Sequence, residues 1–154
     1  MDRLVVDYLR FARPREPNLR EVDLVEIVRR VENQVRMEFG PSGVSLDCDY
    51  NGGPHRVKAD GDQLFEALLN LVQNARQAVN LGGHVWIKVR PASAKAVVLE
   101  VEDDGPGVTQ ELRRKILEPF FTTKSKGSGL GLSVVKQIVD VHGGTLEVRE
   151  RAGG

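Results

Sequence analysis

The sequence predicts an α/β sandwich, in which helices cover one face of a sheet. Segments with helical and with strand periodicity follow one another in the order helix, strands, helix, two strands, loop, helix, strand, and that order is typical of this class. The chain has 154 residues, of which 40% are apolar and 29% are charged. This size and composition are those of one globular domain with material for a core.

The N-terminal part of the chain is expected to hold two helices separated by a break. Residues 1–12 carry apolar residues at helical spacing, and the two prolines of "RPREPN" end this pattern. Residues 22–39 form the second predicted helix, with Asp23 as its N-cap. The apolar face of that helix consists of Val25, Val28, Val31 and Val35.

The middle of the chain alternates between strands and one long helix. Residues 44–50 alternate polar and apolar side chains as a strand does, and residues 55–60 form a shorter one. Residues 60–80 have the longest helical pattern. Residues 84–89 and 96–103 are expected to form two strands around the turn-rich "RPASAK".

The C-terminal part predicts two helices and a strand. Residues 109–116 form a short helix with Thr109 as its cap, and residues 129–143 form another that ends at a glycine pair. Residues 145–150, "TLEVRE", alternate as a last strand.

Charge, hydropathy and cysteine content narrow the possible functions. The chain has 22 Lys and Arg and 22 Asp and Glu, so no basic excess recruits nucleic acid or an anionic membrane. No apolar run is long enough to span a bilayer. Cys48 is the sole cysteine, so a disulfide framework and a thiolate metal site are both excluded. A cytoplasmic location is expected.

The helix at residues 60–80 combines an apolar stripe with a row of amides. Asn70, Asn74 and Gln77 lie together on a different side of the helix from that stripe, about one turn apart. The stripe consists of Leu64, Leu68, Leu71, Ala75 and Ala78. Because asparagine is a poor helix former, the row is either a solvated face or a set of amide oxygens directed at a hard cation.

Two glycine-rich stretches also carry alternatives. Asp103 ends a predicted strand in "EDDGPGV", which is either an ordinary turn or a fixed acceptor at the floor of a pocket whose bare backbone admits a flat ring. Residues 127–132, "GSGLGL", run into a helix, where backbone N–H groups can bind phosphate. The stretch is not a Rossmann turn, because no strand precedes these glycines. It is not a P-loop either, because no Gly-Lys-Ser/Thr follows at the required spacing.

Four motifs occur in a fixed order along the chain: "DQLFEALLNLVQNARQAV", "EDDGPGV", "EPFFTTK" and "GSGLGL". Together they resemble the N, G1, F and G2 boxes of the histidine-kinase ATP-binding domain. Their sequences are most similar to those of nitrogen-regulation-type and PAS-linked sensor kinases. That domain has the Bergerat fold, shared with gyrase, the ninety-kilodalton heat-shock chaperones and the mismatch-repair ATPases. The resemblance implies a mixed, mostly antiparallel sheet covered on one face by about three helices, with the family's final strand missing from this chain.

The resemblance also implies a domain organisation. Residues 1–17 correspond to the end of the second dimerisation helix and the linker after it, and residues 18–154 to the catalytic, ATP-binding domain. A protein-histidine kinase transfers the γ-phosphoryl group of ATP to a histidine on its dimerisation domain, and from there to a response regulator. None of His55, His84 and His142 precedes an acidic residue as that histidine does. We therefore expect no autophosphorylation by the chain alone. The expected partners are its own dimerisation domain and, through the full-length kinase, a response regulator. The parent protein is expected either with or without a membrane anchor.

Several site residues are implied by the same resemblance. Asn74 matches the residue that holds Mg²⁺ through its side-chain oxygen, and Asp103 the residue that accepts from the adenine amino group of ATP and so disfavours GTP. Gly105 and Gly107 leave room for the adenine ring. Asn70 stands where the hydrolysing relatives have a general-base glutamate, and an amide cannot take a proton from water at neutral pH. The chain is therefore expected to be a poor ATPase.

The phosphates are expected to be held by a lid and by the last glycine motif. Residues 118–128 resemble the ATP lid, in which Lys124 is a candidate phosphate contact. Many sensor kinases have a phosphate-binding lysine three residues after the metal asparagine, where this chain has Gln77 with Arg76 beside it. Other nucleotide-binding positions implied by the resemblance are Gly127, Gly129, Leu130 and Gly131.

Three other functions are weighed against the histidine kinase. An anti-sigma-factor-type serine kinase shares the fold, but the linker-like N-terminus and the sequence of the lid disfavour it. A non-catalytic nucleotide-binding interaction module is disfavoured because Asn74, Asp103 and the glycines are intact. A hydrolysing ATPase is disfavoured by Asn70.

Overall fold

The computed structural model describes residues 16–118 and 131–150, which form two compact units. The larger unit lies within residues 18–107 and the smaller within residues 108–150. The helix expected at residues 1–12 and most of the expected lid lie outside the described residues.

The larger unit contains two sheets. β1 (Arg20–Asp23) pairs antiparallel with β3 (Arg56–Ala59). The second sheet has the order β2-β4-β5, in which β2 (Ser45–Asp49) runs parallel to β4 (His84–Ser93), and β4 runs antiparallel to β5 (Ala96–Asp103). Two of the three strand pairs are therefore antiparallel, as the expected mixed sheet requires. β1 was not predicted, because its four residues show no apolar alternation.

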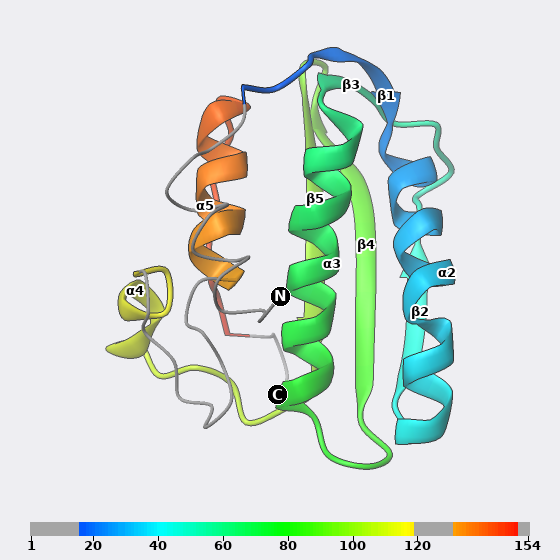
Figure 1. The fold of residues 1–154 in the computed structure, drawn as a ribbon, viewed down its shortest axis with the longest axis vertical. Coiled ribbons are helices and arrows are strands. Elements are labelled where there is room, and N and C mark those ends of the chain that lie inside the picture. Colours follow the sequence, from blue (N-terminus) through cyan, green and yellow to red (C-terminus); the bar gives the residue numbers. More distant parts are fainter. Residues whose placement is uncertain (1–15, 119–130, 151–154) are drawn as a thin grey trace, which may run out of the picture. The chain divides into compact units, whose positions relative to one another are not determined.

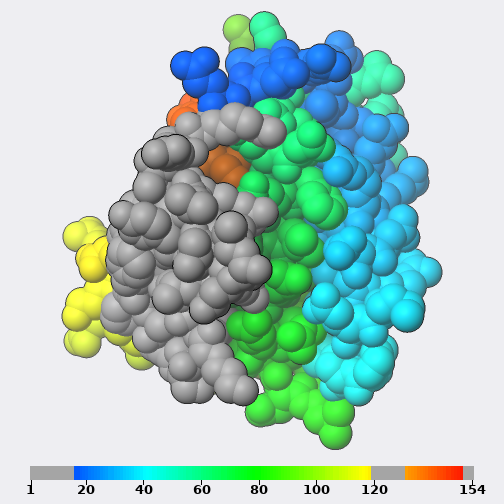
Figure 2. All heavy atoms as spheres, viewed as in Figure 1, coloured from blue at the N-terminus to red at the C-terminus, as the bar shows by residue number. Residues whose placement is uncertain are grey.

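Two helices, α2 (Leu24–Ser42) and α3 (Gly61–Ala78), cover one face of the three-stranded sheet (Figure 1). Their side chains also pack against each other, the blue and cyan atoms of α2 directly beside the green atoms of α3 (Figure 2). Alternate residues of β4 reach this core, where Val85, Ile87 and Val89 are fully buried. The predicted α/β class is confirmed, with two helices in this layer and the third expected helix in the smaller unit.

Helix α2 begins as predicted and continues further than predicted. The side chain of Asp23 caps it by accepting from Val25 N at 3.0 Å, which satisfies one of the donors that a helix start leaves open. The four predicted valines are all buried. The helix runs on through Pro41 to Ser42 and ends at Gly43, whose φ of 68° is the left-handed conformation that glycine adopts easily. With 19 residues against 18 for α3, it is α2 that is the longer helix, contrary to expectation.

Helix α3 is capped by a buried carboxylate. Asp60 Oδ1 accepts from the backbone N–H groups of Asp62 and Gln63, both at 3.1 Å, and Oδ2 accepts from Asn18 N at 2.9 Å. The predicted apolar stripe is correct at Leu68 and Ala75 but omits the other three of the five buried residues, because α3 packs against both α2 and the sheet. The buried residues of α3 are Gln63, Ala67, Leu68, Val72 and Ala75.

The smaller unit contains helices α4 (Leu112–Lys115) and α5 (Gly131–Val141). The prediction of Thr109 as a cap was wrong: the N-cap is Glu111, with no side-chain hydrogen bond, and Thr109 contributes its carbonyl oxygen to Leu112 N instead. Helix α5 ends at the predicted glycine pair, where Gly143 has a φ of 71°.

The strand expected at residues 145–150 does not form. Leu146 and Val148 are half-buried between exposed neighbours, so the alternation that predicted a strand is present. A strand also needs a hydrogen-bonded neighbour, and this segment pairs with no strand of the described chain. Among the described helices, none is long and apolar enough to cross a bilayer.

Candidate functional site

The predicted amide row lies on the second half of α3. Asn70 and Asn74 are half-buried and Gln77 is exposed. Residues four apart are one turn apart on a helix, so Asn74 lies one turn before Ala78, the last residue of α3. The asparagines therefore lie in the C-terminal half of the helix, close to its end.

Arg76 is directed to another side of α3. It is two residues beyond Asn74, which is about 200° around the helix. Its Nε lies 3.8 Å from Oε2 of Glu38 on α2, and less than a third of its side chain is exposed. Gln77 stays within about 60° of Asn74 on the helix surface, so it shares the amide face that Arg76 does not.

The turn after β5 packs against the end of α3. Asp103 is the last residue of β5, and its Oδ1 accepts from Gly105 N at 2.9 Å. A Cβ atom on Gly105 would lie only 2.5 Å from the carbonyl oxygen of Ala78. This distance is too short for any side chain to fit there. Glycine at position 105 is therefore required by packing, and that packing brings the Asp103 carboxylate to the end of the helix that carries Asn70 and Asn74.

Asp104 was not among the predicted site residues, yet its hydrogen bonds connect the same turn to the sheet. Its Oδ1 accepts from His84 N at 2.9 Å, and its own N–H donates to the carbonyl oxygen of His84 at 3.2 Å. Nothing in the sequence identifies this partner, because His84 lies 20 residues away and contributes only backbone atoms.

The remaining predicted nucleotide-binding residues fall into three groups. Gly107 has a φ of 79° and open space around its Cα, so its backbone conformation, not packing, favours glycine there. Gly131 is the first residue of α5 in the smaller unit, and a Cβ atom there would meet nothing. Lys124, Gly127, Gly129 and Leu130 lie outside the described residues.

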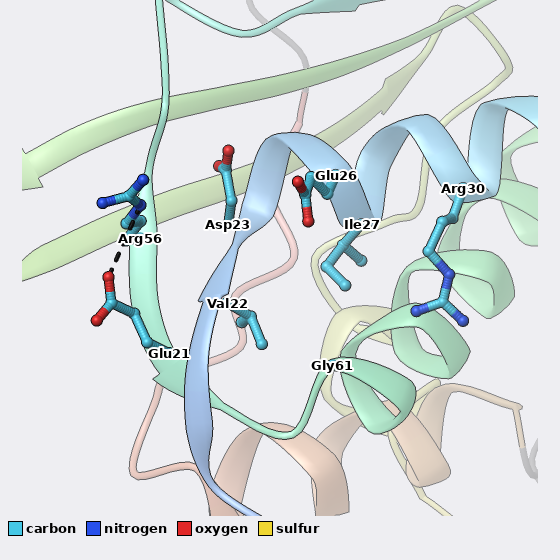
Figure 3. A pocket seen from close by; sticks show the side chains of 8 residues that line it. All are labelled: Glu21, Val22, Asp23, Glu26, Ile27, Arg30, Arg56 and Gly61. Carbon is cyan, nitrogen blue, oxygen red and sulfur yellow. Dashed lines mark ion pairs between the residues drawn. The ribbon is translucent and has the colours of Figure 1, made fainter.

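An open pocket of about 370 Å³ lies elsewhere, between β1, β3 and the N-terminal turns of α2 (Figure 3). Its charged side chains include the ion pair of Arg56 with Glu21, 3.7 Å apart. The lining residues are Glu21, Val22, Asp23, Glu26, Ile27, Arg30, Arg56 and Gly61. None of the predicted nucleotide-binding residues borders it, so this pocket is separate from the site at the end of α3.

Two shifted pKa values also lie away from the predicted site. Burial, together with the negative charge of Glu32, raises the pKa of the Cys48 thiol to about 12. Burial is also the main reason why the pKa of Tyr50 is raised to about 12, and its hydroxyl donates to Glu32 Oε2 at 3.1 Å. Both groups stay protonated at neutral pH, so Cys48 supplies no thiolate nucleophile.

The arrangement at the end of α3 offers amide oxygens, a carboxylate and backbone groups as possible ligand contacts. Within the described residues, no three His, Cys, Asp or Glu side chains are placed to hold a metal ion together. Mg²⁺ does not need such a cage, because it is commonly bound through one or two protein oxygens, water and the phosphates of a substrate.

Comparison with known proteins places the chain in a family. The family model described as histidine kinase-, DNA gyrase B-, and HSP90-like ATPase matches residues 59–154. The sensor histidine kinase ZraS of Klebsiella oxytoca is 35% identical over 153 residues, which are 99% of this chain and 33% of that protein. The chain thus spans a third or less of the length of the curated relatives it matches.

Solved structures agree with this assignment. The catalytic domain of the histidine kinase ThkA, free of nucleotide, is 35% identical with a TM-score of 0.79, covering 86% of this chain and 89% of that one. The histidine kinase ThkA in complex with the response regulator protein TrrA is 28% identical with a TM-score of 0.85, covering 98% of this chain and 43% of that one. The chain therefore belongs to the histidine kinase-, DNA gyrase B-, and HSP90-like ATPase family, among the catalytic domains of histidine kinases, and the resemblance seen in the four motifs is confirmed.

Proposed function

We propose that this chain binds Mg-ATP and presents its γ-phosphoryl group to a histidine on the dimerisation domain of a sensor histidine kinase. Residues 18–154 are the catalytic domain in this proposal, and residues 1–17 are the end of the second dimerisation helix and the linker. The observation that carries the proposal is the close approach of Gly105 to the Ala78 carbonyl, since it joins the turn of Asp103 to the end of the amide-bearing helix.

Asp103 is proposed to recognise adenine by accepting a hydrogen bond from its amino group. Oδ1 already accepts from Gly105 N, and a carboxylate has further acceptor capacity for the adenine amino group. Guanine carries a carbonyl oxygen at the corresponding position, so two acceptors would face each other. Gly107, with open space around it, leaves the backbone accessible to the ring.

Asn74 is proposed to hold Mg²⁺ through its side-chain oxygen. The donor chemistry fits, because an amide oxygen is a hard ligand and the phosphates complete the coordination. The bound ion neutralises negative charge on the phosphate oxygens. Asn70 is proposed to contribute to the same face without acting as a general base, so the domain would hydrolyse ATP only slowly. The γ-phosphoryl group of ATP would go to the histidine of the dimerisation domain instead of to water.

Gln77 is proposed as the phosphate-facing neighbour of Asn74 in preference to Arg76. Arg76 is paired with Glu38 on α2, whereas Gln77 lies on the amide face. The backbone N–H groups around Gly131 at the start of α5 are proposed to bind phosphate, together with Gly127, Gly129, Leu130 and Lys124.

The proposed partners follow from the same assignment. ThkA forms a complex with a response regulator, and we propose a response regulator as the downstream partner of the full-length kinase to which this domain belongs. The domain's direct partner is its own dimerisation domain, in the cytoplasm.

Calorimetric titration tests the nucleotide part of the proposal. We expect the chain to bind one ATP, more tightly with Mg²⁺ than with EDTA, and to release phosphate only slowly. An absence of heat on ATP addition in both conditions, with the chain folded by circular dichroism, would contradict the proposed site.

A further inference from the structure

The turn that carries Asp103 is fastened by its next residue to the sheet. Asp104 makes two bonds to one residue of β4: its carboxylate accepts from His84 N, and its N–H donates to the His84 carbonyl. This pairing continues the β4–β5 ladder one step past Asp103, whose register partner is Val85. Both hydrogen bonds are therefore made to the backbone of the central strand, β4.

The anchor on β4 is itself well held. The His84 ring stacks on Trp86, with ring centroids 4.3 Å apart, and its Nε2 lies within hydrogen-bond distance of Asp47 Oδ2 on the neighbouring strand β2. On the other side of the turn, Gly105 rests against the end of α3. The peptide that follows Asp103 is therefore fixed between the sheet and the helix, which leaves the Asp103 carboxylate few ways to reorient.

We infer that Asp104 is a positioning residue for adenine recognition, which holds the Asp103 carboxylate in register through its hydrogen bond to the His84 N–H. This inference rests on the proposed role of Asp103. The position of the acceptor oxygen of Asp104 carries the effect, so a neutral oxygen at the same place should still accept from the His84 N–H, although a carboxylate accepts more strongly. Asp104 does not touch the nucleotide in this account.

Four variants separate geometry from charge. Asp104→Ala removes the acceptor, and Asp104→Glu keeps the charge but moves the acceptor by one methylene. Asp104→Asn keeps an oxygen acceptor of the same length and removes the charge. His84→Ala removes the ring but retains both backbone groups. We expect Asp104→Ala and Asp104→Glu to disturb adenine recognition and Asp104→Asn to retain it. His84→Ala should disturb it less than Asp104→Ala, because both backbone partners of Asp104 remain.

The readout compares ATP with purine riboside triphosphate, which lacks the 6-amino group that Asp103 is proposed to bind. Asp104→Ala and Asp104→Glu should lower the affinity for ATP about tenfold and leave the affinity for purine riboside triphosphate unchanged. Asp104→Asn should restore the wild-type ratio. A purely structural role would lower both affinities together or neither, and that result would overturn the inference.

A second measurement covers the case in which Asp104→Ala fails to fold. Hydrogen exchange of the His84 amide should be faster in Asp104→Glu than in the wild type and near the wild-type rate in Asp104→Asn. Equal exchange in all three would also overturn the inference. The proposed role of Asp103 fails separately, if Asp103→Ala leaves the ratio of the two affinities unchanged; if that ratio collapses in Asp103→Ala but survives in Asp104→Glu, only the role of Asp104 is wrong.

Discussion

Replacing Asp103 with alanine is expected to lower ATP affinity about ten- to a hundredfold and to abolish the preference for ATP over GTP. The reason is the loss of a charge-assisted hydrogen bond to the adenine amino group, which is worth about 1.5–3 kcal/mol. Calorimetric titration of the variant with each nucleotide in the presence of Mg²⁺ measures both effects.

Asp49→Ala is a matched control for this experiment. Asp49 is the last residue of β2, and its Oδ1 accepts from Asn51 N at 2.9 Å, the same turn geometry that Asp103 makes with Gly105. Removing this carboxylate deletes an equivalent turn bond without touching the proposed site. Equal ATP and GTP affinities in the wild type, or an equal loss of ATP affinity in both variants, would contradict the assignment of Asp103.

Replacing Asn74 with alanine is expected to remove most of the Mg²⁺ dependence of ATP binding and to lower kinase activity. The variant loses the proposed protein ligand, whereas Asn74→Asp retains an oxygen but adds a negative charge beside the phosphates, and should lower activity as well. Titrations in Mg²⁺ and in EDTA give the metal dependence of each variant.

Asn33→Ala provides the comparison for an asparagine at an exposed helical position, since Asn33 lies on the outer surface of α2. It should bind Mg-ATP as the wild type does. If Asn74→Ala also binds Mg-ATP like the wild type, the amide face of α3 is only a solvated surface.

The parts of the fold that depend on local patterns could be predicted from the sequence. The cap at Asp23 and the valine spacing of α2 depend on residues a few positions apart, and the structure confirms both. Strands β4 and β5 carry enough apolar residues to be recognised, although the turn-rich stretch between them extends β4 to Ser93. The class of fold followed from these elements.

The errors concern features that depend on distant partners. Residues 145–150 alternate like a strand but lack a neighbouring strand to pair with, and β1 is a strand because β3 lies beside it, not because of its own composition. The contact of Arg76 with Glu38 on α2 also depends on a distant partner, although it overturns no prediction. No spacing within one segment reports such contacts.

The candidate site divides in the same way. The motifs drew attention to Asp103 and the asparagines, whose chemistry is visible in their residue types. The packing of Gly105 on Ala78 and the bonds of Asp104 to His84 involve backbone atoms on other elements, so sequence alone could not reveal them.

Phosphoryl transfer in trans tests the central claim most directly. The chain is incubated with labelled Mg-ATP, alone and with the dimerisation helices of its parent kinase supplied as a separate polypeptide. We expect no phosphohistidine on the chain alone, and slow labelling of the helices, because the covalent linker that normally raises the effective concentration to about millimolar is absent. The product should be acid-labile and base-stable, as a phosphoramidate is. An acid-stable product would indicate a serine kinase, and strong labelling of the chain itself at His55, His84 or His142 would contradict the account.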